Sequence, residues 1–485
     1  MMQARKQIPA YMTVYLALTL GVLVTLWMAL MEGARLGAIQ LKTLCLADAC
    51  TDSVLAEYHR ELFKRYNLLA VDSAYGTGNI GRTNVEGRLV YYLSMNLPGE
   101  KPKGYLTGLP VSDFLGLHLA GADVTEYTLL SDERGAVFRR LAAQAVEDDL
   151  GVNLAKEAIA WTQSIQAYHL DTRDVEAEKR AVDAQIASYQ GKEIEKGKKL
   201  EFESPTAVVD RQNKSILLWQ TLGNQGVSRK MLNRASLISQ RSKTGAQAYG
   251  NLSYGEASAS EKLTERALFG EYVLSYMGNF RKPRKGNVLD YEVEYVIAGK
   301  ETDAENLSSV LGRILAMREA ANALYLFADE KKSEEAHVVA LALSTILCVP
   351  ELEELFHATI LFTWAYVESL YDLRLLLAGN RVPLFKDEKS WHYSLGNMLA
   401  GLFETNSQGS QGGGMCYQDY LRVLLLLANE EDASYRAMDI VEGNVRLTPG
   451  NANFRMDGCF VKMKCKVSMS SGYGYNAEVW EEKFY

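Results

Sequence analysis

An uncharged apolar segment near the N-terminus constrains this chain more than any other feature. Residues 7–31 contain no Asp, Glu, Lys or Arg, and Ile8–Met31 reads IPAYMTVYLALTLGVLVTLWMALM. As an α-helix, this segment would be about 36 Å long, which is enough to cross a hydrocarbon core of about 30 Å. The sequence therefore predicts a single transmembrane helix over residues 11–31.

A cleaved secretory signal is the alternative interpretation of this segment. Its apolar run is longer than the roughly 7–15 residues of a signal-peptide core, and no A-x-A site follows it closely. No lipobox precedes Cys45 or Cys50, which argues against a lipid anchor. We therefore expect an uncleaved span with the lipid bilayer as its partner.

The charges divide at the same segment. Arg5 and Lys6 are the only charged residues before it, so the rest of the chain carries 50 basic and 60 acidic residues, a net charge of -10. The positive-inside rule predicts a cytoplasmic leader (1–10) and an extracellular body, although Arg35 and Lys42 on the far side weaken the bias. The acidic body excludes a basic nucleic-acid binder, and we expect no nucleic-acid or nucleotide partner.

The predicted helix continues beyond the membrane. No Pro and no turn cluster interrupt residues 32–66, and apolar residues recur there at helical spacing: Ala47, Cys50, Val54, Tyr58 and Leu62. We predict one helix of about 55 residues, apolar in its first half and amphipathic in its second (32–66). An ordinary single-span anchor with a juxtamembrane helix has the same pattern.

The body has the pattern of an α+β head in three parts: 67–131, a helical insertion over 132–280 that resembles a projecting hairpin, and 281–485. The predicted strands are 66–73, 115–130, 289–299, 459–469 and 477–485. The predicted helices are 84–97, 132–190 with a kink near Gly151, 211–222, 228–242, 258–276, 303–328, 333–347, 351–378, 417–429 and 432–445. The stretches 101–110 and 191–205 are predicted loops.

Two of these predictions are specific enough to test individually. Thr302 and Glu305 form a capping box for the helix that follows. Leu289–Gly299 alternates acidic and apolar residues, and Cys459–Met469 alternates lysines with apolar residues, so we predict that these strands pair through their charged faces.

Sequence motifs for cofactor chemistry are scarce. There is no HExxH, paired CxxC, GxSxG or P-loop, and the six His residues have no metal-ligand spacing. Gly76, Gly78 and Gly81 match a dinucleotide-binding G-x-G-x-x-G, but no clear second parallel strand follows, so we interpret them as a turn. We predict no catalytic, cofactor-binding or metal-binding residues and no cofactor.

The cysteines leave the disulfide state open. Cys45 and Cys50 would lie on different helix faces, and Cys459 and Cys465 would lie about 20 Å apart along one strand, so neither pair can bond internally. Cys459 or Cys465 could pair with Cys348 or Cys416. The alternative is that they serve as small buried hydrophobic residues.

A polar cluster within the apolar segment Trp364–Trp391 is the strongest candidate for catalysis. Glu368 and Asp372 lie four residues apart on a predicted helix, the minimum for acid–base glycoside chemistry. The alternative, which we favour, is that they bond Arg374, Lys386 or backbone donors and have a structural role.

Two regions carry a resemblance. Thr13–Leu36, with Glu32 and Arg35 after the apolar run, resembles the N-terminus of TadE/TadG-like pseudopilins of tight-adherence (Flp) pilus systems. The body resembles an uncharacterised family of Gram-positive, largely clostridial, bacteria encoded near such pilus genes. The residues that carry this second resemblance are 53–76, 289–326, 364–391 and 417–445, which together extend over nearly the whole chain.

The resemblance implies a noncatalytic minor pilin-like or assembly component of a Tad-type pilus, with pilus subunits and assembly machinery as partners. Gly33 and Gly37 would permit close helix packing just outside the membrane; a local helix irregularity is the alternative interpretation. The chain departs from the pilin pattern at Ala10 and Tyr15, where prepilin peptidase substrates have Gly and Glu. The competing classes are an anchored extracellular hydrolase of wall glycan or peptide, using Glu368 and Asp372, and a membrane-bound sensor.

Overall fold

The computed structural model describes residues 10–97, 115–195, 198–212, 219, 222, 226–255, 259–402 and 413–485. The chain forms two compact units. The first comprises Met1–Glu133, Gln247–Gly255 and Pro449–Tyr485, and the second comprises Arg134–Ala246 and Glu256–Thr448. The fold is mixed helical and antiparallel-sheet, as predicted. The second unit, which contains most of the helices, extends to Thr448, whereas the predicted helical insertion ends at residue 280.

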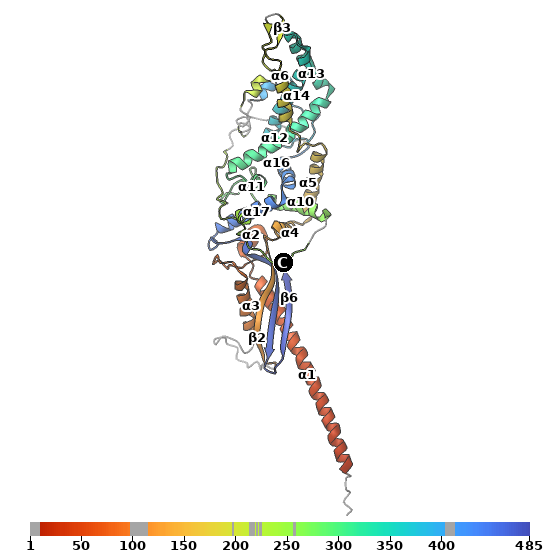
Figure 1. The fold of residues 1–485 in the computed structure, drawn as a ribbon, viewed down its shortest axis with the longest axis vertical. Coiled ribbons are helices and arrows are strands. Elements are labelled where there is room, and N and C mark those ends of the chain that lie inside the picture. Colours follow the sequence, from red (N-terminus) through yellow and green to blue (C-terminus); the bar gives the residue numbers. More distant parts are fainter. Residues whose placement is uncertain are drawn as a thin grey trace, which may run out of the picture. The chain divides into compact units, whose positions relative to one another are not determined.

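An antiparallel sheet forms the centre of the first unit (Figure 1). Its strands are β1 (Val71–Asp72), β2 (Leu117–Leu129), β5 (Cys459–Ser471) and β6 (Asn476–Phe484). The long strand β5 is central, with β2 on one side and β1 and β6 on the other. Alternate side chains of β5 are buried, as its sequence pattern predicts.

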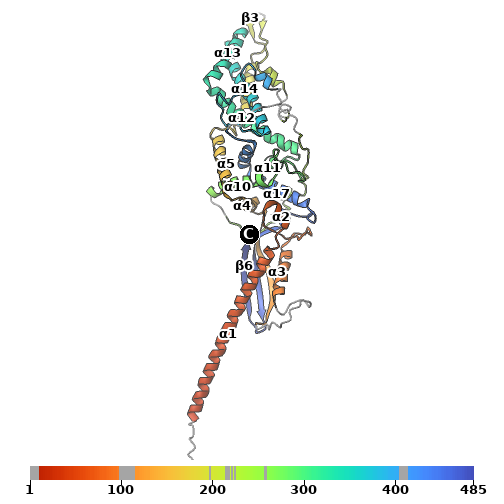
Figure 2. The same cartoon turned by 180° about the vertical axis from the view of Figure 1, so that it is seen from behind.

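Helix α1 (Ala10–Leu55) covers this sheet with its second half, and α3 (Arg82–Asn96) packs beside it (Figures 1 and 2). Most of the predicted apolar stripe is confirmed, because Ala47, Cys50 and Val54 are fully buried. They share one core with apolar residues of β5 such as Val467. The first half of α1 extends beyond the sheet.

The prediction of one continuous helix to residue 66 is wrong. α1 ends at Leu55, and a separate helix α2 (Arg60–Tyr66) follows. The break arises because the His59 backbone N–H donates to Ala70 O at 2.9 Å, which turns the chain back toward β1. The His59 imidazole then caps α2 by accepting from the Leu62 N–H.

The second unit consists mainly of helices. The structure confirms most of the predicted ones, with ends shifted by a few residues: α10 (Ala259–Tyr276), α12 (Asp303–Ala328), α13 (Glu330–Leu347), α14 (Glu353–Ala378), α16 (Tyr417–Leu427) and α17 (Glu430–Arg446). The capping box of Thr302 and Glu305 is present at the start of α12. This unit also contains the short helices α7 (Ala207–Asp210) and α15 (Met398–Gly401).

Other helix predictions need correction. Residues 132–190 form three helices, α4 (Ala136–Gln144), α5 (Asp149–Ala167) and α6 (Val175–Ala187), because turns and caps separate them. In the predicted helix 228–242, only residues 238–242 are helical, as part of α9 (Ile238–Thr244). Strands β3 (Glu193–Glu195) and β4 (Lys198–Lys199) pair within the predicted loop 191–205. The predicted loop 101–110 and most of the predicted helix 211–222 lie outside the described residues.

The predicted strand Leu289–Gly299 is also wrong, because this segment contains helix α11 (Glu292–Ala298). The prediction assumed that Glu292 and Glu294 face water, but both are fully buried. Glu292 accepts from the Gly278 N–H at 2.7 Å and Glu294 from the Phe280 N–H at 2.9 Å. Strand β5 therefore meets acidic residues of β2 and β6 instead.

Candidate functional site

The two carboxylates of the hydrolase hypothesis lie side by side in the core of the helical unit. Glu368 and Asp372 are on α14, and both are fully buried. The ammonium group of Lys386 contacts both carboxylates, with 2.6 Å to Asp372 Oδ1. Glu368 also accepts hydrogen bonds from the His392 and Tyr393 backbone N–H groups, at 2.9 and 3.0 Å.

A second cation completes this buried cluster. Arg318 on α12 donates from Nε and Nη2 to Asp372 Oδ2, at 3.0 and 2.8 Å. Burial favours the neutral form of Asp372, but Lys386 and Arg318 together outweigh it and lower the pKa of this carboxyl. Two carboxylates therefore face two cations in a charge-balanced cluster, as a buried charge requires.

The sequence identified only part of this cluster. The predicted bonds to Lys386 and to backbone donors are confirmed, whereas the Arg374 guanidinium donates to Gly401 O at 2.8 Å. Arg318 was missed, because nothing local in α12 indicates a partner 54 residues further along the chain.

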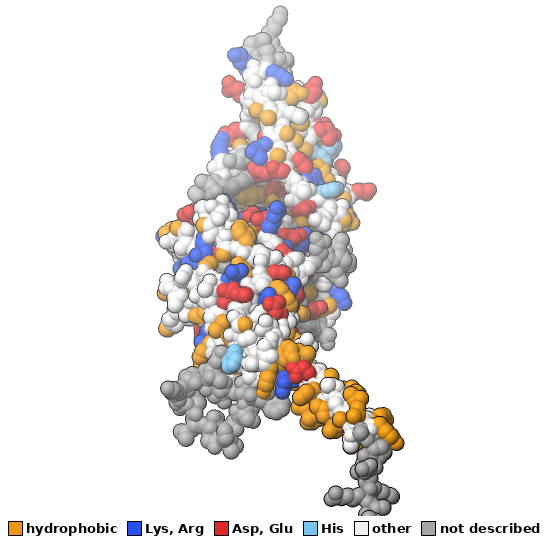
Figure 3. Space-filling model, turned by 60° about the horizontal axis from the view of Figure 1, so that its bottom comes forward, with side chains coloured by type: hydrophobic (Ala, Val, Ile, Leu, Met, Phe, Trp, Pro, Cys, Tyr) orange, Lys and Arg blue, Asp and Glu red, His pale blue; other side chains and the backbone are white. Residues whose placement is uncertain are grey.

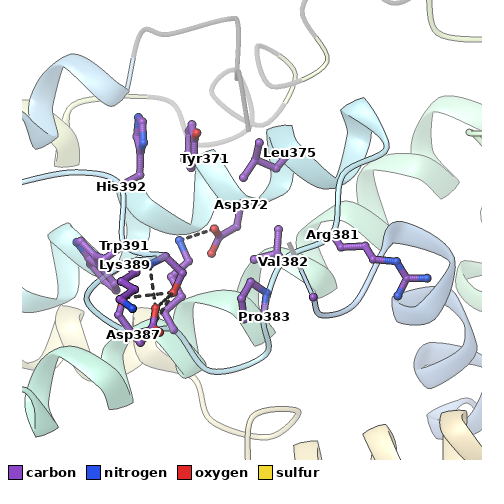
Figure 4. A pocket seen from close by; sticks show the side chains of 13 residues that line it. Tyr371, Asp372, Leu375, Arg381, Val382, Pro383, Asp387, Lys389, Trp391 and His392 are labelled. Atoms are coloured by element: carbon purple, nitrogen blue, oxygen red, sulfur yellow. Dashed lines mark hydrogen bonds and ion pairs between the residues drawn. The ribbon is translucent and has the colours of Figure 1, made fainter. Parts of the chain in front are cut away.

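A cavity of about 460 Å³ lies beside the cluster (Figure 4). Asp372 and Lys386 line it, together with Arg381, Lys389 and His392, and the His392 ring stacks on Tyr371 at a centroid distance of 3.9 Å. A glycoside hydrolase needs a carboxylic acid that keeps its proton near neutral pH. Asp372 is instead held as a carboxylate by two cations, so the arrangement favours structural charge pairing over proton transfer.

The Gly76–Gly81 loop has the geometry of a turn. Gly76 and Gly78 have positive φ angles of 79° and 82°. The Gly76 N–H donates a hydrogen bond to the Asp72 carboxylate at 3.3 Å. A dinucleotide-binding loop would instead use such an N–H group to bind a phosphate. The adjacent cavity of about 370 Å³ is lined by three acidic residues, Glu57, Glu61 and Asp72, and by Arg60.

The histidines and cysteines form no obvious reactive centre. Within the described ranges, no group of three His, Cys, Asp or Glu residues is placed to hold a metal ion. All six cysteines are free, so the pairings with Cys348 or Cys416 that the sequence left open do not form. Cys50, Cys459 and Cys465 are buried, and burial raises the pKa of Cys465 to about 12.

The apolar half of α1 is the other feature that calls for a function. Its most apolar 18-residue window has a mean hydropathy of 2.2, and none of it is buried. Figure 3 shows hydrophobic side chains over this projecting segment, with acidic and basic side chains where it meets the rest of the first unit. The helix is long and apolar enough to cross a membrane, a property of both membrane anchors and signal sequences.

The junction between the apolar half and the head is held by side chains. Glu32 and Arg35 pair at 3.1 Å. The Tyr475 hydroxyl, from the β5–β6 turn, donates to Glu32, and the Arg35 guanidinium lies 4.0 Å from the centre of the Tyr473 ring. The β5–β6 turn is therefore fastened to the first charged residues that follow the apolar segment.

Comparison with known proteins yields one match. Residues 195–471, more than half of the chain, match the model of a family of unknown function, DUF5702. No curated protein and no solved structure matches significantly. The matched range contains α11, α12, α14 with its buried carboxylates, and strand β5. The chain therefore belongs to the DUF5702 family of proteins.

Proposed function

We propose that this protein is a noncatalytic, membrane-anchored protein of the cell surface that serves as a minor pilin-like subunit or assembly component of a Tad/Flp-type pilus. One observation carries the proposal: α1 is a single helix whose first half is apolar and exposed and whose second half is buried against an antiparallel sheet. Pilin-like subunits divide their first helix in the same way.

The charge distribution supports an extracellular head. Arg5 and Lys6 precede the apolar segment, and the remainder of the chain has a net charge of -10. Positive charge retained on the cytoplasmic side orients the helix with its C-terminal end outside. The large acidic head would then meet a partner subunit, the cell wall or another surface.

The buried carboxylates favour this proposal over an anchored wall hydrolase. Glu368 and Asp372 have no exposed side-chain surface, and Lys386 and Arg318 bind them. An acid–base pair must reach substrate and exchange protons, and these groups are committed to a buried ion-pair cluster.

The test is the state of the N-terminus together with fractionation of sheared pili. We expect the protein to be in the membrane, and a pilin route predicts that it is also recovered with sheared pili and has a mature N-terminus at Tyr11. An intact Met1 with no pilus co-purification would exclude the pilin-like role and leave an uncut bitopic anchor.

A further inference from the structure

Among the residues that the structure describes, one end of the sheet in the first unit contains no Asp, Glu, Lys or Arg. From Val467 to Ala477, across the end of β5, the turn and the start of β6, there is no Asp, Glu, Lys or Arg. The neighbouring residues 115–122 also lack Asp, Glu, Lys and Arg and have one ionisable side chain, His118. β2 brings them alongside, since Leu117 pairs with Ser471 and Ala122 with Val467. We call residues 115–122 and 467–477 the uncharged sheet end.

The rest of the sheet is highly charged. Lys462, Lys464 and Lys466 of β5 pair with Glu482, Glu126 and Glu478 at 2.9, 3.4 and 3.0 Å. β6 continues with charged residues from Glu478 to Lys483. The absence of charge is therefore confined to one end of the same strands.

The uncharged sheet end lies beside the point where the apolar segment of α1 ends. Tyr475 bonds to Glu32, the first residue after Met31, and Tyr473 stacks on Arg35. Arg35 is four residues beyond Met31, or about 6 Å along the helix. The headgroup region on each side of a bilayer is about 5–8 Å thick, so both tyrosines are at headgroup depth if α1 spans the membrane.

From this we infer that the uncharged sheet end rests in the lipid headgroup region, with Tyr473 and Tyr475 as interfacial anchors. This inference depends on the proposed membrane anchoring. Tyrosine suits this position because its ring is apolar and its hydroxyl is polar, and both membrane interfaces are enriched in it. The Tyr473 side chain is half exposed and available to lipid.

Lipid fits this surface better than a second copy of the chain. Residues 11–31 are exposed around the whole helix circumference, with Thr19 alone partly covered, and are apolar on all sides. A helix that packed on one protein partner would show a single apolar stripe, whereas lipid surrounds it. The sheet end borders this all-round apolar surface.

The experiment measures lipid contact at two positions of one strand. The full-length protein, with exposed Cys45 and Cys348 replaced by Ser, receives one bimane-labelled cysteine, Asn476→Cys at the uncharged end or Glu482→Cys at the charged end. Both positions are exposed and lie about 20 Å apart along β6. The protein is reconstituted in phosphatidylglycerol–phosphatidylethanolamine vesicles that carry a lipid with a nitroxide near the headgroup. The variant with Cys45 and Cys348 replaced by Ser and no added cysteine measures background labelling.

We expect the nitroxide lipid to quench the Asn476→Cys label at least twofold more than the Glu482→Cys label, in protein that resists carbonate extraction. Equal quenching of both labels in carbonate-resistant protein would overturn the inference while leaving membrane anchoring intact. A label at position 476 shielded from both lipid and iodide would indicate a protein partner and would also overturn it. Release of the protein by carbonate would refute both the anchoring and the inference.

Discussion

Single buried charges in the helical unit depend on donors from distant segments. Lys386 neutralises Glu368 and Asp372 of α14, and Arg318 of α12 shares Asp372. In the folded protein, the attraction between these charges offsets the free-energy cost of removing them from water. Removal of one partner leaves the other charge buried and unpaired, so it lowers the free energy of unfolding by far more than the pair contributes in total. The cluster therefore makes strong predictions for single substitutions.

Lys386→Met should lower the free energy of unfolding by about 3–5 kcal/mol, because it leaves two carboxylates in the core with one cation. Urea denaturation followed by circular dichroism measures the change. The matched control is Lys331→Met, since Lys331 and its partner Glu388 are both more than 70% exposed and should contribute less than about 1 kcal/mol. Equal effects of the two substitutions would refute the role assigned to the cluster.

Glu294 predicts a pH dependence of stability. Burial raises the pKa of Glu294, and hydrogen bonds from Phe280 and Tyr417 lower it. Burial is the larger effect, so the pKa rises from 4.5 to about 7. The folded state therefore keeps a proton that the unfolded state releases, and this contribution is fully present below pH 4.5 and is lost as the pH rises to about 7. Over that window the loss is at most about 1.4 kcal/mol per pH unit.

The measurement is urea denaturation at several pH values between 4.5 and 7. Glu294→Gln, which cannot ionise, should flatten this part of the profile. Asp439, whose pKa burial raises to about 6, continues to contribute in the variant. An unchanged slope in Glu294→Gln would show that this carboxyl is ionised in the folded protein.

At the scale of elements, two segments with similar alternation folded differently. In β5 the lysines are partly exposed and the alternate apolar residues are buried, so the strand forms as its pattern predicts. In α11 the acidic residues are buried together with the apolar ones and bond backbone N–H groups of residues 278 and 280. Alternation predicts a strand only where the polar residues face water.

The lysine row of β5 provides an element-scale prediction. Lys466→Glu should destabilise the first unit by about 1 kcal/mol, because it places a carboxylate beside Glu478 and opposite Asp123 on β2. Lys466→Gln removes the attraction without adding repulsion and should cost less. In thermal denaturation, the midpoint should be highest for the wild type, lower for Lys466→Gln and lowest for Lys466→Glu. Any other order would contradict the pairing.

At the scale of the whole molecule, α1 performs two tasks that separate near residue 32. The first residue of α1 that belongs to the core is Ile39, and the apolar window before it is not buried. The helix thus joins an exposed apolar segment, long enough to cross a membrane, to a segment that packs on the sheet.

Deletion of residues 1–31 should therefore move the protein from the membrane to the soluble fraction without loss of the fold. Carbonate extraction and circular dichroism would test this, with a thermal midpoint within a few degrees of the full chain. A longer deletion through Cys50 removes Ile39, Leu46 and Ala47 from the core and should abolish folding of the first unit. Loss of structure in the shorter deletion would mean that the apolar half also supports the head.

Features whose signals are local could be predicted from the amino-acid sequence. The uncharged apolar run, the buried stripe of Ala47, Cys50 and Val54, the capping box of Thr302 and the alternation of β5 all depend on residues within a few positions of each other. The tertiary structure alone decided the break after Leu55, the partners of β5, the helical state of α11 and the pairing of Arg318 with Asp372. These depend on contacts between residues that are distant in sequence. The stability of a buried polar group is set by such a partner, and no local periodicity encodes it.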